Sequence, residues 1–336
     1  MGERGPMLRT FALMIAVLGA TLLIACDEGG EAPSPTAISS PTVAGTAGLS
    51  PTLVADTPVG TVEASVPEGK IAFQSRRDGS GEIYLLTPER EVNITNDPGE
   101  DANPSVSPDG SKIAFSSDRE GVFHIYVVNV DGSGLVKLTG DAAGDFSPRW
   151  SPDGKRIAFS RTGALYVMDS DGSNVQEVTE PGPEATAAPC EAGSFVGGWS
   201  PDGERLTFYA ASATRQQGQV CIVNVDGSDL TVVVSEPPGW HVEPAWSPDG
   251  EWIAYRSIRD GNHEIRIVKP DGTSDTNLTN SPATDLEPTW SPDGGWILFS
   301  SDRTGAFDLY MMRPDGSQVT RLTNSGGKDS DPSWGP

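Results

Sequence analysis

The sequence predicts an all-β fold, a six-bladed β-propeller with four antiparallel strands in each blade. Two observations support this fold class. One turn sequence, Ser-Pro-Asp-Gly, recurs at intervals of 44, 49, 47 and 44 residues. Each copy is flanked by short apolar runs with strand-like alternation, and the repeats show no helical period. Four short strands in about 44 residues are typical of propeller blades, because a blade buries both of its faces only by stacking on neighbours in a ring.

The repeated turn lies between the first and the second strand of each unit. Ser at its first position, Pro at the second and Gly at the fourth suit a type I turn. The five copies begin at Ser107, Ser151, Ser200, Ser247 and Ser291. The preceding first strand ends in Trp, or in Val106 for the first copy. Residues 112–115, 125–128 and 135–139 illustrate the second, third and brief fourth strands, with an Asp-Gly-Ser turn before the fourth.

The number of strands predicts how the ring closes. Residues 67–336 supply six second, third and fourth strands, but six first strands only if the terminal segment 331–334 is counted. We therefore predict that this segment pairs with residues 70–75 and completes the first blade. An open arrangement would leave strand edges unprotected.

The segment before the propeller predicts export and a lipid anchor. Arg4 and Arg9 precede an apolar run at 10–25, which is short for a bilayer span and typical of a signal peptide. The run ends in Leu-Ile-Ala-Cys26, which resembles the bacterial lipobox and implies cleavage after residue 25 and lipidation of Cys26. An ordinary signal peptide or an uncleaved anchor is the alternative. We therefore expect an extracytoplasmic protein anchored to a bacterial membrane, either periplasmic or on the cell surface.

Residues 26–66 have the composition of a disordered tether. They are rich in Ser, Thr, Pro, Ala and Gly and contain no Lys or Arg. Such a segment cannot bury enough apolar surface to offset the entropy lost on ordering. The predicted organisation is therefore a signal peptide at 1–25, a lipidated tether at 26–66 and a propeller at 67–336.

The charge of the chain narrows the class of partner. Forty-seven acidic residues against 23 basic ones give a formal net charge of −24. This balance argues against nucleic-acid binding, which depends on clustered Lys and Arg. It favours a basic partner, because excess negative charge attracts cationic ligands.

The repeat also resembles that of a known family. The pattern Pro-x-Trp-Ser-Pro-Asp-Gly, Ile-Ala-Phe, Ser-x-Arg-x-Gly, Ile-Tyr, Asp-Gly-Ser, Leu-Thr looks like the repeat of TolB-type six-bladed propellers, over residues 67–336. The resemblance implies a binding platform in the bacterial cell envelope. Similar blades also precede the hydrolase domain of prolyl oligopeptidase-like enzymes. The chain differs from TolB in having a lipobox and a tether in place of a separate N-terminal α/β domain.

Two cysteines beyond Cys26 predict a disulfide. Cys190 lies in the long loop before the fourth blade, and Cys221 is expected to begin the third strand of that blade. Because strand direction alternates, both should lie at one end of the ring, where an oxidising compartment would allow them to pair. Two unpaired thiols are the alternative.

Arginines and aspartates recur at equivalent places in the repeats. The loops between second and third strands contain Arg77, Arg119, Arg161, Arg259 and Arg303. Three residues before the Pro that opens each first strand lie Asp101, Asp145, Asp285 and Asp329, and His241 has this position in the fifth blade. Both sets should lie at one end of the ring. They predict Arg–Asp pairs that join loops, or an acidic rim that attracts a basic partner or a cation, and the two interpretations are compatible.

Trp240 and His241 are candidate binding residues in an irregular part of the chain. Trp240 lies in a loop beside departures from the repeat at 179–194 and 211–218. Large aromatic side chains in loops are typical interface anchors, although a Trp can also fold over its own loop. Trp252 and Trp296 replace basic residues at the beginning of second strands. We expect them to pack between blades, and an apolar patch at the opposite end of the ring is the alternative.

The sequence thus predicts a monomeric, non-catalytic scaffold that binds a protein or another envelope component and reaches the membrane only through its lipid. No catalytic residue, metal ligand or cofactor is predicted, since no nucleophile elbow or metal-ligand spacing is present. One alternative is a metal-binding or lactonase-like propeller that uses its central channel, for which the ring of aspartates is the hint. The other is an accessory propeller of a separate peptidase.

Overall fold

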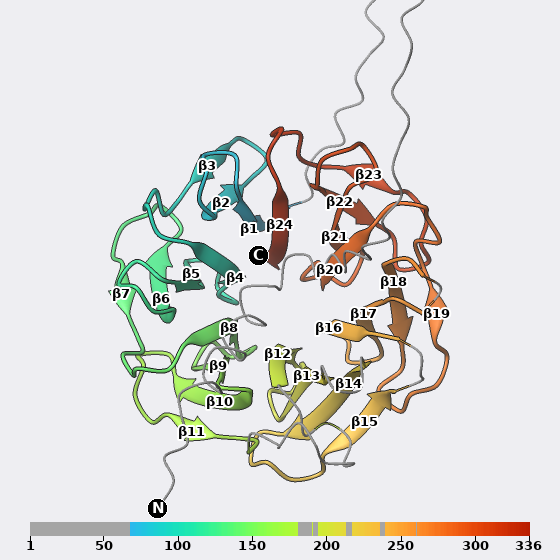
Figure 1. The fold of residues 1–336 in the computed structure, drawn as a ribbon, viewed down its shortest axis with the longest axis horizontal. Helices are drawn as coiled ribbons and strands as arrows, with labels where there is room; N and C mark the ends of the chain where they lie inside the picture. Colours follow the sequence, from blue (N-terminus) through green and yellow to red (C-terminus); the bar gives the residue numbers. More distant parts are fainter. Residues whose placement is uncertain (1–67, 181–189, 191–193, 213–216, 236–238, 260) are drawn as a thin grey trace, which may run out of the picture. The chain divides into compact units, whose positions relative to one another are not determined.

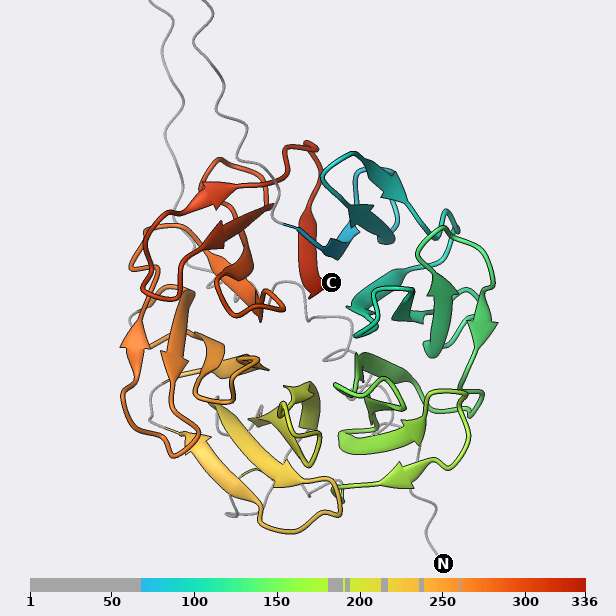
Figure 2. The same cartoon turned by 180° about the vertical axis from the view of Figure 1, so that it is seen from behind.

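The computed structural model describes residues 68–180, 190, 194–212, 217–235, 239–259 and 261–336. They form six four-stranded antiparallel sheets, arranged as blades around a common axis (Figures 1 and 2). The predicted six-bladed all-β propeller is therefore confirmed. No helix within these ranges has the length and apolar character needed to cross a membrane. The predicted signal peptide, Cys26 and the tether lie outside the described residues.

The blades follow one another along the chain, and the first strand of each is innermost (Figure 1). Blade 1 comprises β24 (Asp329–Gly335), β1 (Lys70–Ser75), β2 (Glu82–Leu86) and β3 (Glu91–Asn93). Blade 2 comprises β4 (Asp101–Val106), β5 (Lys112–Ser117), β6 (His124–Asn129) and β7 (Val136–Lys137). Blade 3 comprises β8 (Asp145–Trp150), β9 (Arg156–Arg161), β10 (Ala164–Asp169) and β11 (Gln176–Glu177).

The second half of the ring has the same plan, with longer strands in blade 4. Blade 4 comprises β12 (Ser194–Trp199), β13 (Arg205–Ser212), β14 (Gln217–Asn224) and β15 (Thr231–Val234). Blade 5 comprises β16 (His241–Trp246), β17 (Ile253–Ser257), β18 (Glu264–Val268) and β19 (Thr276–Asn277). Blade 6 comprises β20 (Asp285–Trp290), β21 (Ile297–Ser301), β22 (Asp308–Met312) and β23 (Thr320–Arg321).

The ring closes where β24 pairs with β1. The antiparallel register runs from Lys70 opposite Gly335 to Ser75 opposite Asp329, and the Ser75 hydroxyl donates a hydrogen bond of 2.6 Å to the Asp329 carboxylate. The closing strand predicted from the sequence is confirmed, and it begins two residues earlier than the predicted segment.

The core consists of clusters between neighbouring blades. Ile113 and Phe115 of β5 pack against Ala72 of β1 in one such cluster, and all three are fully buried. On the other face of β1, Ile71 and Phe73 pack against residues of blade 6. The alternation of large and small side chains along second strands therefore lets adjacent blades approach closely. Each buried large side chain contributes roughly 1.5–3 kcal/mol to stability.

The Ser-Pro-Asp-Gly turns, together with the Asp-Gly turns before the fourth strands, form one end of the ring, which we call the turn end. Gly154 has a φ of +69°, and a Cβ on it would lie 3.2 Å from the Pro108 ring of the preceding blade. Gly294 has a φ of +71°, and its Cβ would lie 3.7 Å from Pro248. Glycine suits this turn because it tolerates the left-handed conformation and leaves room for the neighbouring proline.

Trp252 and Trp296 pack between blades, as expected from the sequence. Trp252 lies against the cluster that includes Trp290, and Trp296 lies against the cluster that includes Trp334. The Arg313 guanidinium is 3.7 Å from the centroid of the Trp296 ring. These tryptophans therefore stabilise the joints between blades.

Candidate functional site

The end of the ring opposite the turns, which we call the Arg–Asp end, is organised by ion pairs in blades 1, 2, 3 and 6. In each pair an Arg at the end of the second strand, or just after it, contacts the Asp that begins the first strand of the same blade. The pairs are Arg77–Asp329 at 3.1 Å, Arg119–Asp101 at 3.1 Å, Arg161–Asp145 at 2.6 Å and Arg303–Asp285 at 2.8 Å. These contacts show that the predicted Arg–Asp pairs form in four blades, and that the arginines and the aspartates lie at one end of the ring.

These four aspartates do not form the exposed acidic rim that was the second interpretation of the sequence. Asp101, Asp145, Asp285 and Asp329 are all 0% exposed. Burial raises the pKa of Asp101, while the Ser117 hydroxyl and the Arg119 charge act in the opposite direction. The carboxylates therefore fix the beginning of each innermost strand instead of facing a ligand. Glu120 and Asp141, whose side chains are 56% and 67% exposed, lie on the surface at this end and form ion pairs of 2.6 Å with Lys137 and Arg161.

Blade 5 has a different arrangement, because His241 takes the place of the Asp. His241 is 0% exposed, and its Nδ1 lies 3.0 Å from the Ser257 hydroxyl. Its ring meets Tyr255 edge-on, with the centroids 5.9 Å apart. Arg259 pairs instead with Asp275, at 2.8 Å. His241 is thus part of the interior. The expectation that it contacts a partner is corrected, because its side chain is buried, as are the four aspartates.

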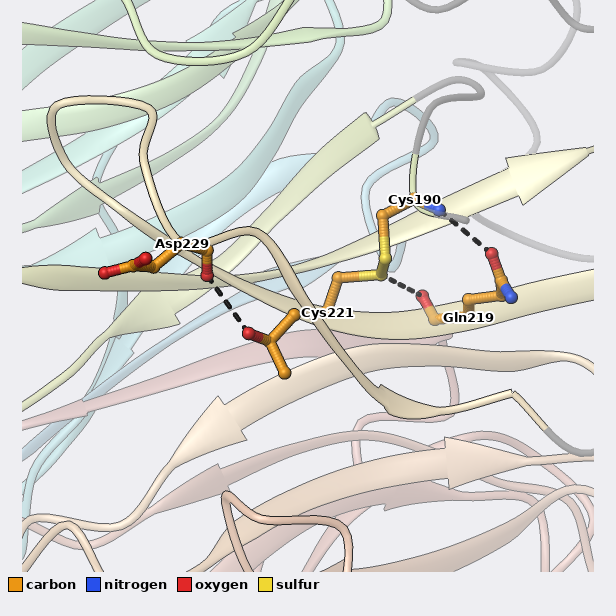
Figure 3. Close-up of a disulfide and its surroundings, with 5 residues drawn as sticks. Cys190, Gln219, Cys221 and Asp229 are labelled. Atoms are coloured by element: carbon orange, nitrogen blue, oxygen red, sulfur yellow. Dashed lines mark hydrogen bonds between the residues drawn. A yellow bond between two sulfur atoms is a disulfide. The ribbon is translucent and has the colours of Figure 1, made fainter. Parts of the chain in front are cut away.

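Blade 4 has Ser194 at the Asp position, and a disulfide lies nearby. Cys190 and Cys221 are bonded, with their Cα atoms 6.3 Å apart (Figure 3). The Cys190 N–H donates a hydrogen bond of 3.1 Å to the Gln219 side chain. Both cysteines are buried among apolar residues of blades 3 and 4, including Leu165 and Phe208. The bond therefore connects the segment before β12 to the third strand of the blade.

The position of Cys221 differs from the prediction. It lies inside β14, which already begins at Gln217, and it pairs with Phe208 of β13. The hairpin of β13 and β14 has eight residues in each strand, against five or six in the second and third strands of the other blades. Cys221 has the register position that Tyr126 has in blade 2, and the strand begins before it at Gln217.

Trp240 lies where the extended hairpin meets blade 5. The Gly218 N–H donates a hydrogen bond of 3.4 Å to the Gly239 carbonyl, and the Trp240 carbonyl accepts one of 3.0 Å from Ile258. The Trp240 side chain is partly exposed and belongs to none of the core clusters formed by the described residues. We call the region of Cys190, residues 218–219 and residues 239–240 the blade 4–5 corner, and in it Gln219 and Trp240 are partly exposed.

The innermost strands also carry a set of residues that the sequence analysis missed. The third residue of each has a left-handed backbone in five blades, with φ between 51° and 57°: Asn103, Ser147, Glu243, Glu287 and Asp331. Glu243, Glu287 and Asp331 come from the successive blades 5, 6 and 1, and we call them the axial carboxylates. A Glu243 oxygen accepts a hydrogen bond of 3.0 Å from the Glu287 N–H, and a Glu287 oxygen accepts one of 2.7 Å from the Asp331 N–H.

Burial raises the pKa of two of these carboxyl groups, Glu243 and Asp331. It raises the pKa of Glu243 to about 7, with the Glu287 charge in support and the Arg256 charge opposed. It raises the pKa of Asp331 to about 8, again with the Glu287 charge in support. Across the axis, burial lowers the pKa of Arg149 in blade 3. Among the described residues, no group of three or more His, Cys, Asp or Glu side chains has an arrangement that could hold a metal ion.

Comparison with known proteins identifies the family. Residues 54–165 and 160–336 match the family model described as the TolB beta propeller domain. The chain belongs to the TolB β-propeller domain family. The Tol-Pal system protein TolB of Syntrophus aciditrophicus is 43% identical over 49 residues, which are 15% of this chain and 11% of that protein. The Protein TolB homolog of Chlorobium luteolum is 35% identical over 68 residues, 20% of this chain and 15% of that protein.

Solved structures extend the likeness over the whole ring. The crystal structure of TolB from Acinetobacter baumannii superposes with a TM-score of 0.66 at 19% identity, over 80% of this chain and 67% of that one. At this identity the likeness shows a shared fold. Within the TolB-type propeller, four predicted Arg–Asp pairs are in contact and the two cysteines are bonded to each other. Trp240 belongs to the blade 4–5 corner, which also contains Cys190.

Proposed function

We propose that this TolB-type propeller is an extracytoplasmic lipoprotein that binds a protein, or another component of the cell envelope, at the blade 4–5 corner. The observation that carries the proposal is a break in an otherwise regular ring. Four blades share the Arg–Asp pair, while the corner has an extended hairpin, a disulfide and the partly exposed Trp240. A rigid scaffold that presents irregular loops at one end is a common arrangement for binding.

The charge of the molecule indicates the chemistry of the partner. The chain has a formal net charge of −24, from 47 acidic and 23 basic residues. An acidic field of this kind accelerates association with a basic partner at low ionic strength. We therefore infer a basic surface or segment as the partner, bound by a single copy of the propeller.

We infer that the protein has no catalytic activity. At the Arg–Asp end, each buried aspartate is already engaged by an arginine of its own blade. The alternative, a channel that binds a metal ion or acts as a lactonase, would show stoichiometric calcium uptake in calorimetry on the metal-free protein. The remaining alternative, a propeller that assists a separate peptidase, would be supported if a hydrolase is the crosslinked partner.

Trp240→Ala is expected to weaken partner binding roughly tenfold or more while leaving the melting temperature within about 2 °C, because truncation of a central aromatic anchor typically costs more than 1 kcal/mol of binding. The measurement is crosslinking in intact membranes followed by affinity purification. Leu135→Ala is the matched control, since Leu135 is 45% exposed and lies at the turn end. Equal recovery of the same partner with Trp240→Ala would show that this residue is not the anchor.

Cys26→Ser is expected to move the protein from the membrane fraction to the soluble fraction. The variant removes the sulfur to which the lipid would be attached. A tether without a lipid has little affinity for a bilayer. Fatty-acid labelling of wild type and variant measures the change directly. Incorporation of label into the Cys26→Ser protein, or no incorporation into wild type, would contradict the proposed anchor.

A further inference from the structure

Neighbouring blades are joined near the axis by hydrogen bonds of two kinds. Between blades 2 and 3 the acceptor is a neutral hydroxyl, since Ser116 accepts from the Ser147 N–H at 3.2 Å. Between blades 3 and 4 it is again a hydroxyl, since Ser160 accepts from the Val196 N–H at 2.9 Å. Between blades 5 and 6, and between blades 6 and 1, the acceptors are the carboxylates of Glu243 and Glu287. Only the second kind of junction can change its charge with pH.

Among the ion pairs of the described residues, one includes an axial carboxylate. Arg256 of β17 lies 2.9 Å from Glu243, and the Ser300 hydroxyl of β21 donates to Glu287 at 2.6 Å. Two other cations act on the axial carboxylates: Arg149 of β8, and Lys328, which precedes β24. Tyr209 of β13 is a titratable side chain that lies in the electrostatic field of the same residues. His263 lies 3.2 Å from Arg256, and burial, reinforced by the Arg256 charge, lowers its pKa to about 4, so it is neutral near pH 7.

We propose that the axial carboxylates form a pH-sensitive junction, which holds a proton near neutral pH and loosens the joint between blade 6 and the closing strand β24 when that proton is lost. The hydrogen bonds from the backbone of the next blade place Glu243 beside Glu287 and Glu287 beside Asp331. The charge of Glu287 therefore disfavours ionisation of both Glu243 and Asp331.

The direction of the pH effect follows from the raised pKa values. Glu243 and Asp331 titrate at about 7 and about 8 in the folded protein, whereas free carboxyls titrate near 4. Between these limits the folded protein binds more protons than the unfolded chain, so stability falls as pH rises. The stabilisation is fully present below about pH 4 and is lost as the pH passes through 7 and 8.

The test is thermal unfolding of the full chain at pH 6 and at pH 9. The wild-type melting temperature is expected to be lower at pH 9 by roughly 5 °C, and Asp331→Asn and Glu243→Gln should each remove much of this difference. Glu264→Gln is the matched control, because Glu264 is a buried carboxylate that accepts from Ser281 within its own blade. This control should retain the wild-type difference even if its overall stability is lower.

A second measurement does not depend on variants that fold. Carboxyl ¹³C NMR of the wild-type protein is expected to show one or two carboxyl groups that titrate between pH 6 and 9. If all carboxyl groups titrate below pH 6, the proposal is overturned. It is also overturned if Asp331→Asn keeps the full pH difference in melting temperature, or if Glu264→Gln abolishes it.

Discussion

Deletion of residues 331–336 is expected to prevent formation of a stable closed ring. The deletion removes most of β24, including Trp334, which is 7% exposed and packs with Ile71 and Phe73. Loss of a buried Trp alone costs about 3–5 kcal/mol, and β1 also loses its hydrogen-bonded neighbour. Whole domains are stable by only about 5–15 kcal/mol, so we expect a melting temperature lower by more than roughly 10 °C, or no cooperative transition.

Circular dichroism melting and size-exclusion chromatography measure this outcome. Deletion of Pro336 alone is the control, because this residue is exposed and lies after the end of β24. It should leave the melting temperature nearly unchanged. A protein shortened by all six residues that melts no earlier than the parent would contradict closure by β24.

Replacement of both Cys190 and Cys221 by alanine is expected to lower the free energy of unfolding by about 3–4 kcal/mol. The bond closes a loop with a sequence separation of 31, and a crosslink of this span restricts the unfolded chain by an amount of that order. The two sulfurs are also buried in the cluster between blades 3 and 4. Urea denaturation, with the slope of the transition compared between proteins, gives the difference.

Cys26→Ser is the control for this experiment, because it removes the third cysteine without touching the described fold. Its urea midpoint should equal that of the wild type. Digestion under non-reducing conditions should yield one peptide pair that contains Cys190 and Cys221. Two thiols that react with an alkylating agent in the mature protein would exclude the bond.

The sequence was sufficient for the fold because each structural cue is repeated. Every Ser-Pro-Asp-Gly turn marks the same place in a blade, and the count of first strands required the terminal segment to complete blade 1. Equivalent positions in the repeats also predicted that Arg119 pairs with Asp101, and they predicted the corresponding pairs in three other blades. The repeat period indicates which residues lie at the same end of the ring. It does not indicate which of these residues are covered by neighbouring loops. The aspartates were therefore located correctly and their exposure was not.

Irregular backbone explains the remaining differences. A register shift between Ala102 and Ser105 in blade 2, and its counterparts in other blades, interrupts the alternation of the innermost strands. The left-handed residues in these bulges include the axial carboxylates, so a strict two-residue period does not reveal that they meet. The prediction that Cys221 begins the third strand was wrong because β14 begins four residues earlier, at Gln217.

The pairing of β24 with β1 has a consequence for biosynthesis. Ser75 and Asp329 are partners separated by 254 residues, and a ribosome adds roughly 5–20 residues per second. The nascent first blade therefore waits on the order of 10–50 s for its missing strand, with an open edge that could recruit another growing chain. A holding chaperone, or translocation before folding, would protect the unfinished molecule during this interval.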